Sequence, residues 1–413
     1  MVAQPLVTNR PLSQHWYLGG RIISGTGSDA GLAIVDSGLT DAPVVAAVHA
    51  WLASLGRSAT WRAVNLTPSF DEVSELAGSL GRPGFLLAIG GGRILDAVKL
   101  ASLMAESSRV RAHLTVPQRC GAVVVPMDVR RTRPLVAIPT TLGTGSESSA
   151  VVVVDDESRR RLVMGQPLAP EGRILDPLAT GGLAPHVVAE GLLEVLARLT
   201  APYLGSSADP LADALVEALV GRVIALGTHL RRSGLPGDAR LELAEISSLS
   251  HDHIMGRRRD PYAVKSWLIG SELARAAGVR KMTALSAVLP VYWARISGGD
   301  TRFGDPDRLV RIWDVVRRTH RGAETLPMSP SDGLVRLMSE WGINTLVHLD
   351  PADRTALTAH IMRAWGTGLP MLGALRADDI AGVLAEATGD PAARACPAPS
   401  PVWPVRNLEL RPR

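Results

Sequence analysis

Lysine is nearly absent from this chain of 413 residues, which holds only Lys99, Lys265 and Lys281 among its 44 basic residues. Lysine is normally one of the commonest residues in proteins. The alanine-, arginine- and leucine-rich background indicates a coding bias that places arginine wherever any positive charge suffices. Because arginine does not replace a compact, titratable ammonium, the retained lysines indicate functional positions. Chance retention is the alternative for each of them.

Cysteine and long apolar runs are also scarce. The two cysteines, Cys120 and Cys396, are too few and too far apart for a disulfide framework or a cysteine-based zinc site, which favours a reducing cytosol. The chain lacks any run of about 18 apolar residues, and residues 1–10 lack the basic start and apolar stretch of a secretory signal. We therefore expect a cytoplasmic protein without a membrane segment.

The charge balance argues against a nucleic-acid partner. The formal net charge is only +4, and the basic residues are spread along the chain rather than concentrated in one stretch. With 46% hydrophobic and 20% charged residues, the composition is that of a globular protein and excludes wholesale disorder. The length favours two domains.

Short apolar runs alternate with helical stretches over the first part of the chain. Runs that suit strands lie at residues 33–35, 85–89, 135–138 and 150–154, and helical stretches lie at residues 42–55 and 95–104. This alternation predicts a parallel sheet with helices on both faces. We therefore predict an α/β, Rossmann-like nucleotide-binding domain over residues 1–182.

From about residue 185 the pattern changes to long helical periods without comparable strand-like runs. These periods lie at residues 208–231, 239–255, 283–297, 306–320, 351–365 and 376–388. They predict an all-α domain over residues 183–390. Residues 391–413 hold six prolines, which predicts a loose tail.

Three glycines, Gly90, Gly91 and Gly92, lie between a predicted strand and a predicted helix. Glycine lets backbone N–H groups approach a phosphate closely, and the N-terminus of the following helix adds partial positive charge. The segment therefore suits the binding of a dinucleotide diphosphate. A plain tight turn is the alternative.

A second loop also follows a predicted strand and has the sequence Ile138-Pro-Thr-Thr-Leu-Gly-Thr-Gly-Ser-Glu. It offers Thr140, Thr141 and Thr144 as hydroxyl donors to a diphosphate and ribose. At the end of the first strand, Asp36 can bind ribose hydroxyls and would repel a 2′-phosphate, which favours NAD over NADP. A simple turn residue is the alternative for Asp36.

Together these three segments resemble the iron-containing alcohol dehydrogenase family of the dehydroquinate-synthase-like superfamily. The resemblance is carried by Val35-Asp-Ser-Gly-Leu, by the three glycines with Asp96 and Lys99, and by the threonine-rich loop, and it extends over nearly the whole chain. It implies a substrate site in a cleft between a nucleotide domain and a helical domain. The cofactor-binding residues that it implies are Gly90, Gly91, Gly92, Asp96, Thr140, Thr141, Thr144 and Arg161.

The resemblance also implies a divalent metal held by one aspartate and three histidines, which would polarise the alcohol oxygen. The matching positions here are Leu193, Ala197, Trp267 and Lys281, and Ser271 stands where the family has a further histidine between the last two. Glu194 lies beside the first position, but its neighbour one helical turn later is Arg198, which cannot bind a metal.

Histidines elsewhere in the helical half do not restore such a site. His251 and His253 are two residues apart and so do not share a helical face. We expect both to be solvated or capping residues, and His186 to lie on the surface. The sequence therefore predicts a protein without a metal site.

Two of the three lysines, Lys265 and Lys281, fall where the resemblance places the chemistry. A lysine in an apolar cleft can lose its proton and act as a base, or it can stay charged and stabilise an alkoxide or anchor a carboxylate. We predict that Lys281, helped by Lys265, replaces the metal electrostatically; ordinary exposed charges are the alternative. The basic segment 257–259 could receive an acidic substrate, or could simply be solvated.

The leading hypothesis is an NAD-dependent, metal-independent dehydrogenase of a secondary alcohol. A site that anchors a carboxylate suits a β-hydroxy acid, whose β-keto product loses CO2 readily. The chain also resembles the daptide-type peptide-tailoring dehydrogenases, which act on a C-terminal threonine. The alternatives are a non-catalytic nucleotide-binding partner or scaffold subunit and a lyase or cyclase, which is disfavoured because that group also relies on a metal. We expect a small-molecule or peptide substrate, and a homodimer or a complex with another protein.

Overall fold

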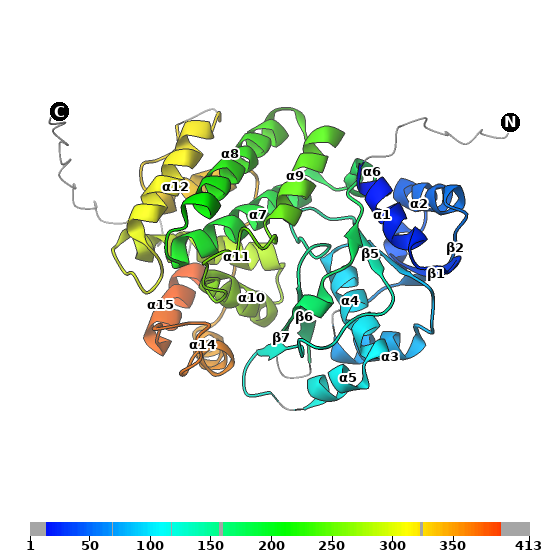
Figure 1. Cartoon of the computed structure of the whole chain (residues 1–413). Coiled ribbons are helices and arrows are strands. Elements are labelled where there is room, and N and C mark those ends of the chain that lie inside the picture. The colour runs from blue at the N-terminus through cyan, green and yellow to red at the C-terminus, as the bar shows by residue number, and fades with distance from the viewer. Residues whose placement is uncertain (1–13, 68, 117, 157–159, 323–324, 390–413) are drawn as a thin grey trace, which may run out of the picture.

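The computed structural model describes residues 14–67, 69–116, 118–156, 160–322 and 325–389. Within these residues every strand lies before residue 174, and a second part made of helices lies beside the first (Figure 1). This arrangement confirms the predicted fold class. The last strand ends at Arg173 and the first long helix of the second part begins at Pro185, while the domain boundary at residue 182 stays a prediction. The tail predicted over residues 391–413 lies outside the described residues.

The larger sheet has five parallel strands. Their order across the sheet is β2 (Ser58–Val64), β1 (Ala30–Asp36), β3 (Leu86–Gly90), β5 (Leu135–Pro139) and β8 (Gly172–Arg173). β3 and β5 are buried along their whole length, as expected for apolar strands at the centre of a sheet that is covered on both faces.

Helices cover both faces of this sheet. Side chains alternate along each strand, so neighbouring residues pack into different cores. Val35 packs in one core with α1 (Gln14–Ser24) and α2 (Pro43–Ser54). Its neighbour Ile34 packs in a second core with α3 (Phe70–Ser79) and α4 (Gly92–Glu106). The arrangement brings the carboxyl ends of the strands to one edge, where the predicted binding loops begin.

The strand predicted at residues 150–154 exists, but its place in the parallel sheet was predicted wrongly. It is β6 (Val151–Asp155), which pairs antiparallel with β7 (Arg160–Met164) in a separate sheet. The third strand of this sheet is β4 (Ala122–Val124), and α5 (Ser108–Thr115) precedes it. Alternate residues of β6 are buried, which is the pattern of a strand with one covered face.

The second part is a set of helices around one large apolar core. Its helices are α7 (Pro185–Gly205), α8 (Pro210–Ser233), α9 (Gly237–Leu249), α10 (Lys265–Ala277), α11 (Lys281–Ser297), α12 (Pro306–Thr319), α13 (Pro330–Glu340), α14 (Pro351–Trp365) and α15 (Ala377–Thr388). The six predicted periods correspond to α8, α9, α11, α12, α14 and α15. The helix predicted over residues 239–255 is shorter than expected: it ends at Leu249, and turns follow it. The patterns did not predict α7, α10 or α13 as separate periods.

Local sequence explains where several of these helices begin. Asp209, Asp305 and Ser329 cap α8, α12 and α13 with side-chain oxygens that accept backbone N–H groups, and each is followed by proline. Such caps, with proline in the first turn, start helices efficiently. Of the helices in the described residues, none combines the length and the apolar character that a membrane crossing requires.

Candidate functional site

The three predicted cofactor segments meet at the carboxyl edge of the larger sheet. In the register of the parallel strands, Val35 pairs with Ile89 and Gly90 pairs with Pro139. The backbone N–H of Thr140 donates to the carbonyl oxygen of Gly90 at 3.0 Å. Ligands of open parallel sheets bind at this edge, so the arrangement fits the predicted dinucleotide site.

The glycine loop and the threonine loop lie against each other. A Cβ atom on Gly91 would lie 3.0 Å from the methyl carbon of Thr141, and one on Gly92 would lie 3.1 Å from that of Thr144. The hydroxyl oxygens of Thr141 and Thr144 are buried and have no hydrogen-bond partner among the described residues. Because such groups normally find a partner, these hydroxyls fit a bound polar ligand.

The glycine loop also leads into the start of a long helix. Gly91 is the N-cap of α4, and no side chain caps the first N–H groups of this helix at that position. The first N–H groups of a helix and its dipole favour an anion. Together with the unpartnered threonine hydroxyls, this helix start has the chemistry to hold a diphosphate.

Asp36 lies at the end of β1, at the same edge. Its Oδ1 accepts the N–H of Gly38 at 3.0 Å and so caps the short 3-10 turn Ser37–Leu39. Asp36 therefore serves as a turn residue, as the alternative interpretation expected. Its contact with a ribose stays a prediction.

Lys99 is completely buried and ties the threonine loop to α4. Its ammonium donates to Asp96 at 3.3 Å, to the carbonyl of Ser146 at 3.0 Å, to Ser149 at 3.1 Å and to the carbonyl of Val151 at 2.8 Å. Burial lowers the pKa of Lys99 from its ordinary value. One of the three lysines thus has a structural explanation.

The other two residues of the predicted cofactor set have partners within the protein. Asp96 accepts from Lys99 and, through Oδ2, from the N–H of Val153 at 3.2 Å. Arg161 donates to Asp156 and to the carbonyl of Leu114, each at 2.6 Å. Direct contact of Asp96 or Arg161 with a cofactor stays a prediction.

Lys281 begins α11 and belongs to a group of four side chains, which we call the charge cluster: Glu194, Arg198, Trp267 and Lys281. The Lys281 ammonium donates to Glu194 Oε1 at 2.6 Å, and Arg198 donates to the same oxygen at 3.2 Å. Both cations lie over the ring of Trp267, at 4.9 and 5.4 Å from its centroid. Two cations thus share one carboxylate and one aromatic ring.

Burial differs among the members of the charge cluster. Glu194 is only 5% exposed, whereas the Lys281 side chain keeps 37% of its surface exposed. Glu194 and Arg198 are four residues apart on α7, so they lie on one face of the helix. The result is a fixed, buried carboxylate that holds a cation within reach of solvent.

The charge cluster contacts the threonine loop directly. Arg198 donates to the carbonyl oxygen of Gly143 at 2.6 Å and to that of Thr144 at 3.0 Å. Lys281 is therefore connected to the predicted cofactor loop through Glu194 and Arg198. The sequence offered one signal for this pair, the i, i+4 spacing of a glutamate and an arginine, but the partner loop was not predictable from it.

The residues at the implied ligand positions do not fit a divalent metal. Leu193 and Ala197 are buried apolar side chains, the Trp267 ring faces two cations, and Lys281 would repel a metal ion. Among the described residues, no group of three or more His, Cys, Asp or Glu side chains could hold a metal.

His251, which was expected to be a solvated or capping residue, is partly exposed and lies against the threonine loop. A Cβ atom on Gly145 would lie 2.2 Å from its ring, and Nε2 lies 3.4 Å from the carbonyl oxygen of Thr144. Burial, and then the charge of Arg198, lower the pKa of His251 well below its ordinary value of 6.5. By contrast, His253 is exposed and pairs with Asp252.

Lys265, at the start of α10, has a different set of partners from Lys281. Its ammonium donates to the carbonyl oxygen of Arg302 at 2.7 Å, and burial lowers the pKa of Lys265. No hydrogen bond or ion pair in the described part of the chain joins Lys265 to the charge cluster. Its catalytic role stays a prediction.

The basic segment at residues 257–259 has acidic partners of its own. Arg257 donates to Asp209 at 3.0 Å, and Arg258 lies 3.9 Å from the same carboxylate. The buried Arg259 pairs with Asp213. Each of the three arginines thus has an acidic partner within the helical part.

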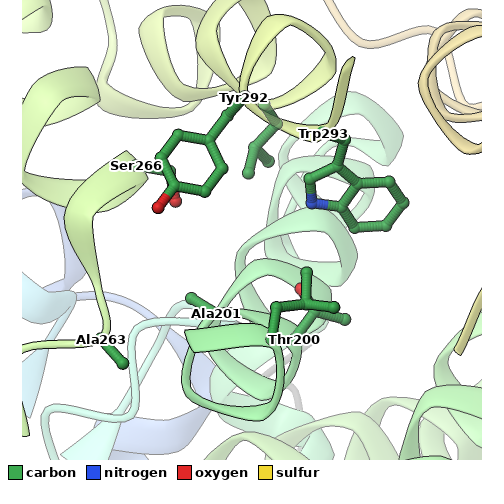
Figure 2. A pocket seen from close by; sticks show the side chains of 8 residues that line it. Thr200, Ala201, Ala263, Ser266, Tyr292 and Trp293 are labelled. Atoms are coloured by element: carbon green, nitrogen blue, oxygen red, sulfur yellow. The ribbon is translucent and has the colours of Figure 1, made fainter. Parts of the chain in front are cut away.

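A small cavity lies inside the helical part, between α7, α10 and α11 (Figure 2). Thr200, Ser266, Tyr292 and Trp293 are among its lining side chains, and its volume is about 10 Å³. This is room for about one water molecule. The cavity is therefore too small for an alcohol substrate or a dinucleotide.

In sequence, a known protein family matches only the first part of the chain. Residues 19–177 match the family described as iron-containing alcohol dehydrogenase. The probable alcohol dehydrogenase EutG of Salmonella typhimurium is 29% identical over 205 residues, which cover 48% of this chain and 49% of EutG. The chain spans about half the length of the curated relatives it matches.

Solved structures are similar over nearly the whole chain. The NADH-dependent butanol dehydrogenase A of Thermotoga maritima has a TM-score of 0.73 at 16% identity, covering 92% of this chain and 96% of that chain. A sulfoacetaldehyde reductase of Bifidobacterium kashiwanohense in complex with NAD+ has a TM-score of 0.68 at 17% identity, with the same coverage. The chain therefore shares its fold with these two enzymes, and its residues 19–177 are similar in sequence to the iron-containing alcohol dehydrogenase family.

Proposed function

We propose that this chain is an NAD-dependent oxidoreductase that oxidises a secondary alcohol without a metal ion. The observation that carries the proposal is the position of Lys281. Its ammonium is held by the buried carboxylate of Glu194, and Arg198 connects that carboxylate to the threonine loop. A cation is thus fixed beside the loop that has the chemistry to hold a dinucleotide.

Several features support NAD as the cofactor. The buried hydroxyls of Thr141 and Thr144 lack protein partners among the described residues, and the N-terminus of α4 faces the same edge of the sheet. Asp36, at the end of β1, would repel a 2′-phosphate. A structural neighbour was solved with NAD+, and the matched family consists of alcohol dehydrogenases by its description.

The reaction converts a secondary alcohol and NAD+ into a ketone, NADH and a proton. Bound NAD+ supplies the hydride acceptor. The chain must stabilise the alkoxide that forms when the hydroxyl proton leaves, and Lys281 can do so electrostatically. Within the charge cluster, Lys281 and Arg198 share the single carboxylate of Glu194. The cluster therefore has one surplus positive charge, which is the sign needed for this task.

The same surplus charge supports a substrate with a carboxylate. A β-hydroxy acid would be oxidised to a β-keto acid, which then loses CO2 to give a ketone. A peptide with a C-terminal threonine has this arrangement, with its hydroxyl on the carbon next to the one that bears the carboxylate. We therefore propose such a peptide or small hydroxy acid as substrate, with a role in natural-product biosynthesis. A homodimer, or a complex with a partner protein that delivers the peptide, is part of the same proposal.

A non-catalytic nucleotide-binding or scaffold subunit is the second candidate. Its supporting observation is that the residues at the implied metal positions, such as Leu193 and Ala197, are apolar and buried. Such a subunit would bind NADH but would not turn over any alcohol.

The test measures NADH formation by absorbance, in the presence of a chelator, with a panel of β-hydroxy acids and threonine-ended peptides. The Lys281→Met variant should lose about a hundredfold in kcat, the typical effect of removing one electrostatic group from such a site. The matched control is Arg280→Met, which removes the neighbouring, more exposed cation that pairs with Glu190. Lys265→Ala tests the supporting role of Lys265. NADH binding without turnover of any panel member would favour the scaffold subunit.

A further inference from the structure

The guanidinium of Arg198, whose side chain is only 12% exposed, joins α7 to the threonine loop by hydrogen bonds. It donates to the carbonyl oxygens of Gly143 and Thr144 at 2.6 and 3.0 Å. It also donates to Glu194 Oε1 at 3.2 Å and to Ser250 at 3.4 Å. One side chain thus contacts the loop, α7 and the end of α9.

The backbone of the threonine loop packs closely against α7 at Gly143, whose carbonyl accepts from Arg198. A Cβ atom on Gly143 would lie 2.6 Å from the carbonyl oxygen of Gly191, and the φ angle of Gly143 is +96°. Only glycine fits such a close approach in this conformation. The two carbonyl groups that Arg198 binds therefore belong to a turn with a single well-defined path.

The orientation of this turn decides where the Thr144 hydroxyl lies. The Thr144 carbonyl accepts from Arg198, and the methyl group of Thr144 contacts Gly92 of the glycine loop. Its hydroxyl oxygen is buried without a partner among the described residues. A change in the carbonyl orientation would move this hydroxyl away from the glycine loop.

We propose that Arg198 is a positioning residue that sets the Gly143–Thr144 turn for dinucleotide binding and, through Glu194, orients Lys281. The inference rests on the proposed function for its ligand, an NAD-type dinucleotide. It assigns a role that requires arginine, because two separate nitrogens of the guanidinium act at once. Nη1 donates to the carbonyl of Gly143, and Nη2 donates to the carbonyl of Thr144 and to Glu194. A lysine ammonium, which is a point donor on a flexible stem, cannot reproduce this geometry.

The experiment measures NADH binding to the full-length protein by titration calorimetry, without any turnover. Arg198→Lys should weaken NADH binding about tenfold or more, the loss expected when charge-assisted hydrogen bonds are broken. Arg198→Ala should be weakened as well and partly restored by added guanidinium ion. The control is Arg222→Lys, on an exposed pair with Glu242, which should bind NADH as the wild-type protein does.

A merely structural role would give a different result. It would lower the melting temperature and the folded fraction but leave the NADH Kd of the folded protein unchanged. A folded Arg198→Lys variant with wild-type Kd overturns the inference. If neither variant folds, Ser250→Ala and Glu194→Gln remain: both release one restraint on the guanidinium, and unchanged Kd in both also overturns it.

Failure of the proposed function is recognised separately. A wild-type protein that binds NADH but oxidises no alcohol contradicts the proposed activity, while the Arg198 variants still decide the positioning role by binding alone. A wild-type protein that does not bind NADH contradicts both.

Discussion

The ion pair between Glu194 and Lys281 can be tested by a double-mutant cycle on stability. Glu194→Gln removes the charge that holds two cations but keeps the shape of the side chain. Lys281→Met removes the ammonium and keeps a flexible chain of similar length. The pair is suited to this test because Glu194 is buried and its Oε1 lies 2.6 Å from the Lys281 nitrogen.

The expected magnitude follows from the surroundings of each group. Breaking a fully buried ion pair costs roughly 3–5 kcal/mol. Glu194→Gln should cost less, about 2 kcal/mol, because Lys281 can turn to solvent and Arg198 keeps its two carbonyl acceptors. The coupling between the two substitutions should then be about 1–2 kcal/mol, within the range for residues in direct contact.

The assay is urea denaturation of the wild-type protein, both single variants and the double variant at neutral pH. The exposed pair Arg222–Glu242 provides a matched control, whose coupling should not exceed about 0.5 kcal/mol. A Glu194–Lys281 coupling no larger than that of the control would refute the view that Glu194 holds Lys281 in place.

Two further predictions concern the cofactor loops. Asp36→Ser should reduce the preference for NAD over NADP by about tenfold, measured as the ratio of the two Kd values; an unchanged ratio would remove Asp36 from the ribose site. For His251, the unfolded imidazole gains a proton below about pH 6.5, whereas burial holds the pKa of the folded side chain well below that value. The unfolded state therefore binds more protons, and unfolding free energy should fall by up to about 1.4 kcal/mol per pH unit as pH decreases below 6.5. His251→Gln should flatten this dependence in denaturant titrations at pH 5–7, and an equally steep slope in the variant would show that other groups cause it.

The sequence predicted those features that depend on short segments. The apolar runs at β3 and β5 are buried throughout, so their strands and the loops after them were recognisable. The glycine and threonine loops lie together because parallel strands end at one edge. Local composition and topology were enough for this part of the site.

Features that depend on packing between the two parts were not predictable. Glu194 and Arg198 were known only as a helical pair, and nothing in their spacing indicated that Arg198 reaches the carbonyls of Gly143 and Thr144. The contact of His251 with Gly145 was not predictable either, because the two residues lie more than a hundred positions apart in the sequence. The strand β6 was placed in the wrong sheet because the composition of a strand does not show which other strand it will pair with, here β7.

We propose that the ammonium of Lys281 acts at a position where the resemblance to iron-containing alcohol dehydrogenases implies a metal ion. The most direct test compares turnover of metal-stripped wild-type protein before and after addition of zinc or iron, with metal content measured on the same samples. We predict full NADH formation from the stripped protein and no increase when metal is added. Activity that disappears with the metal and returns in proportion to its content would contradict the claim.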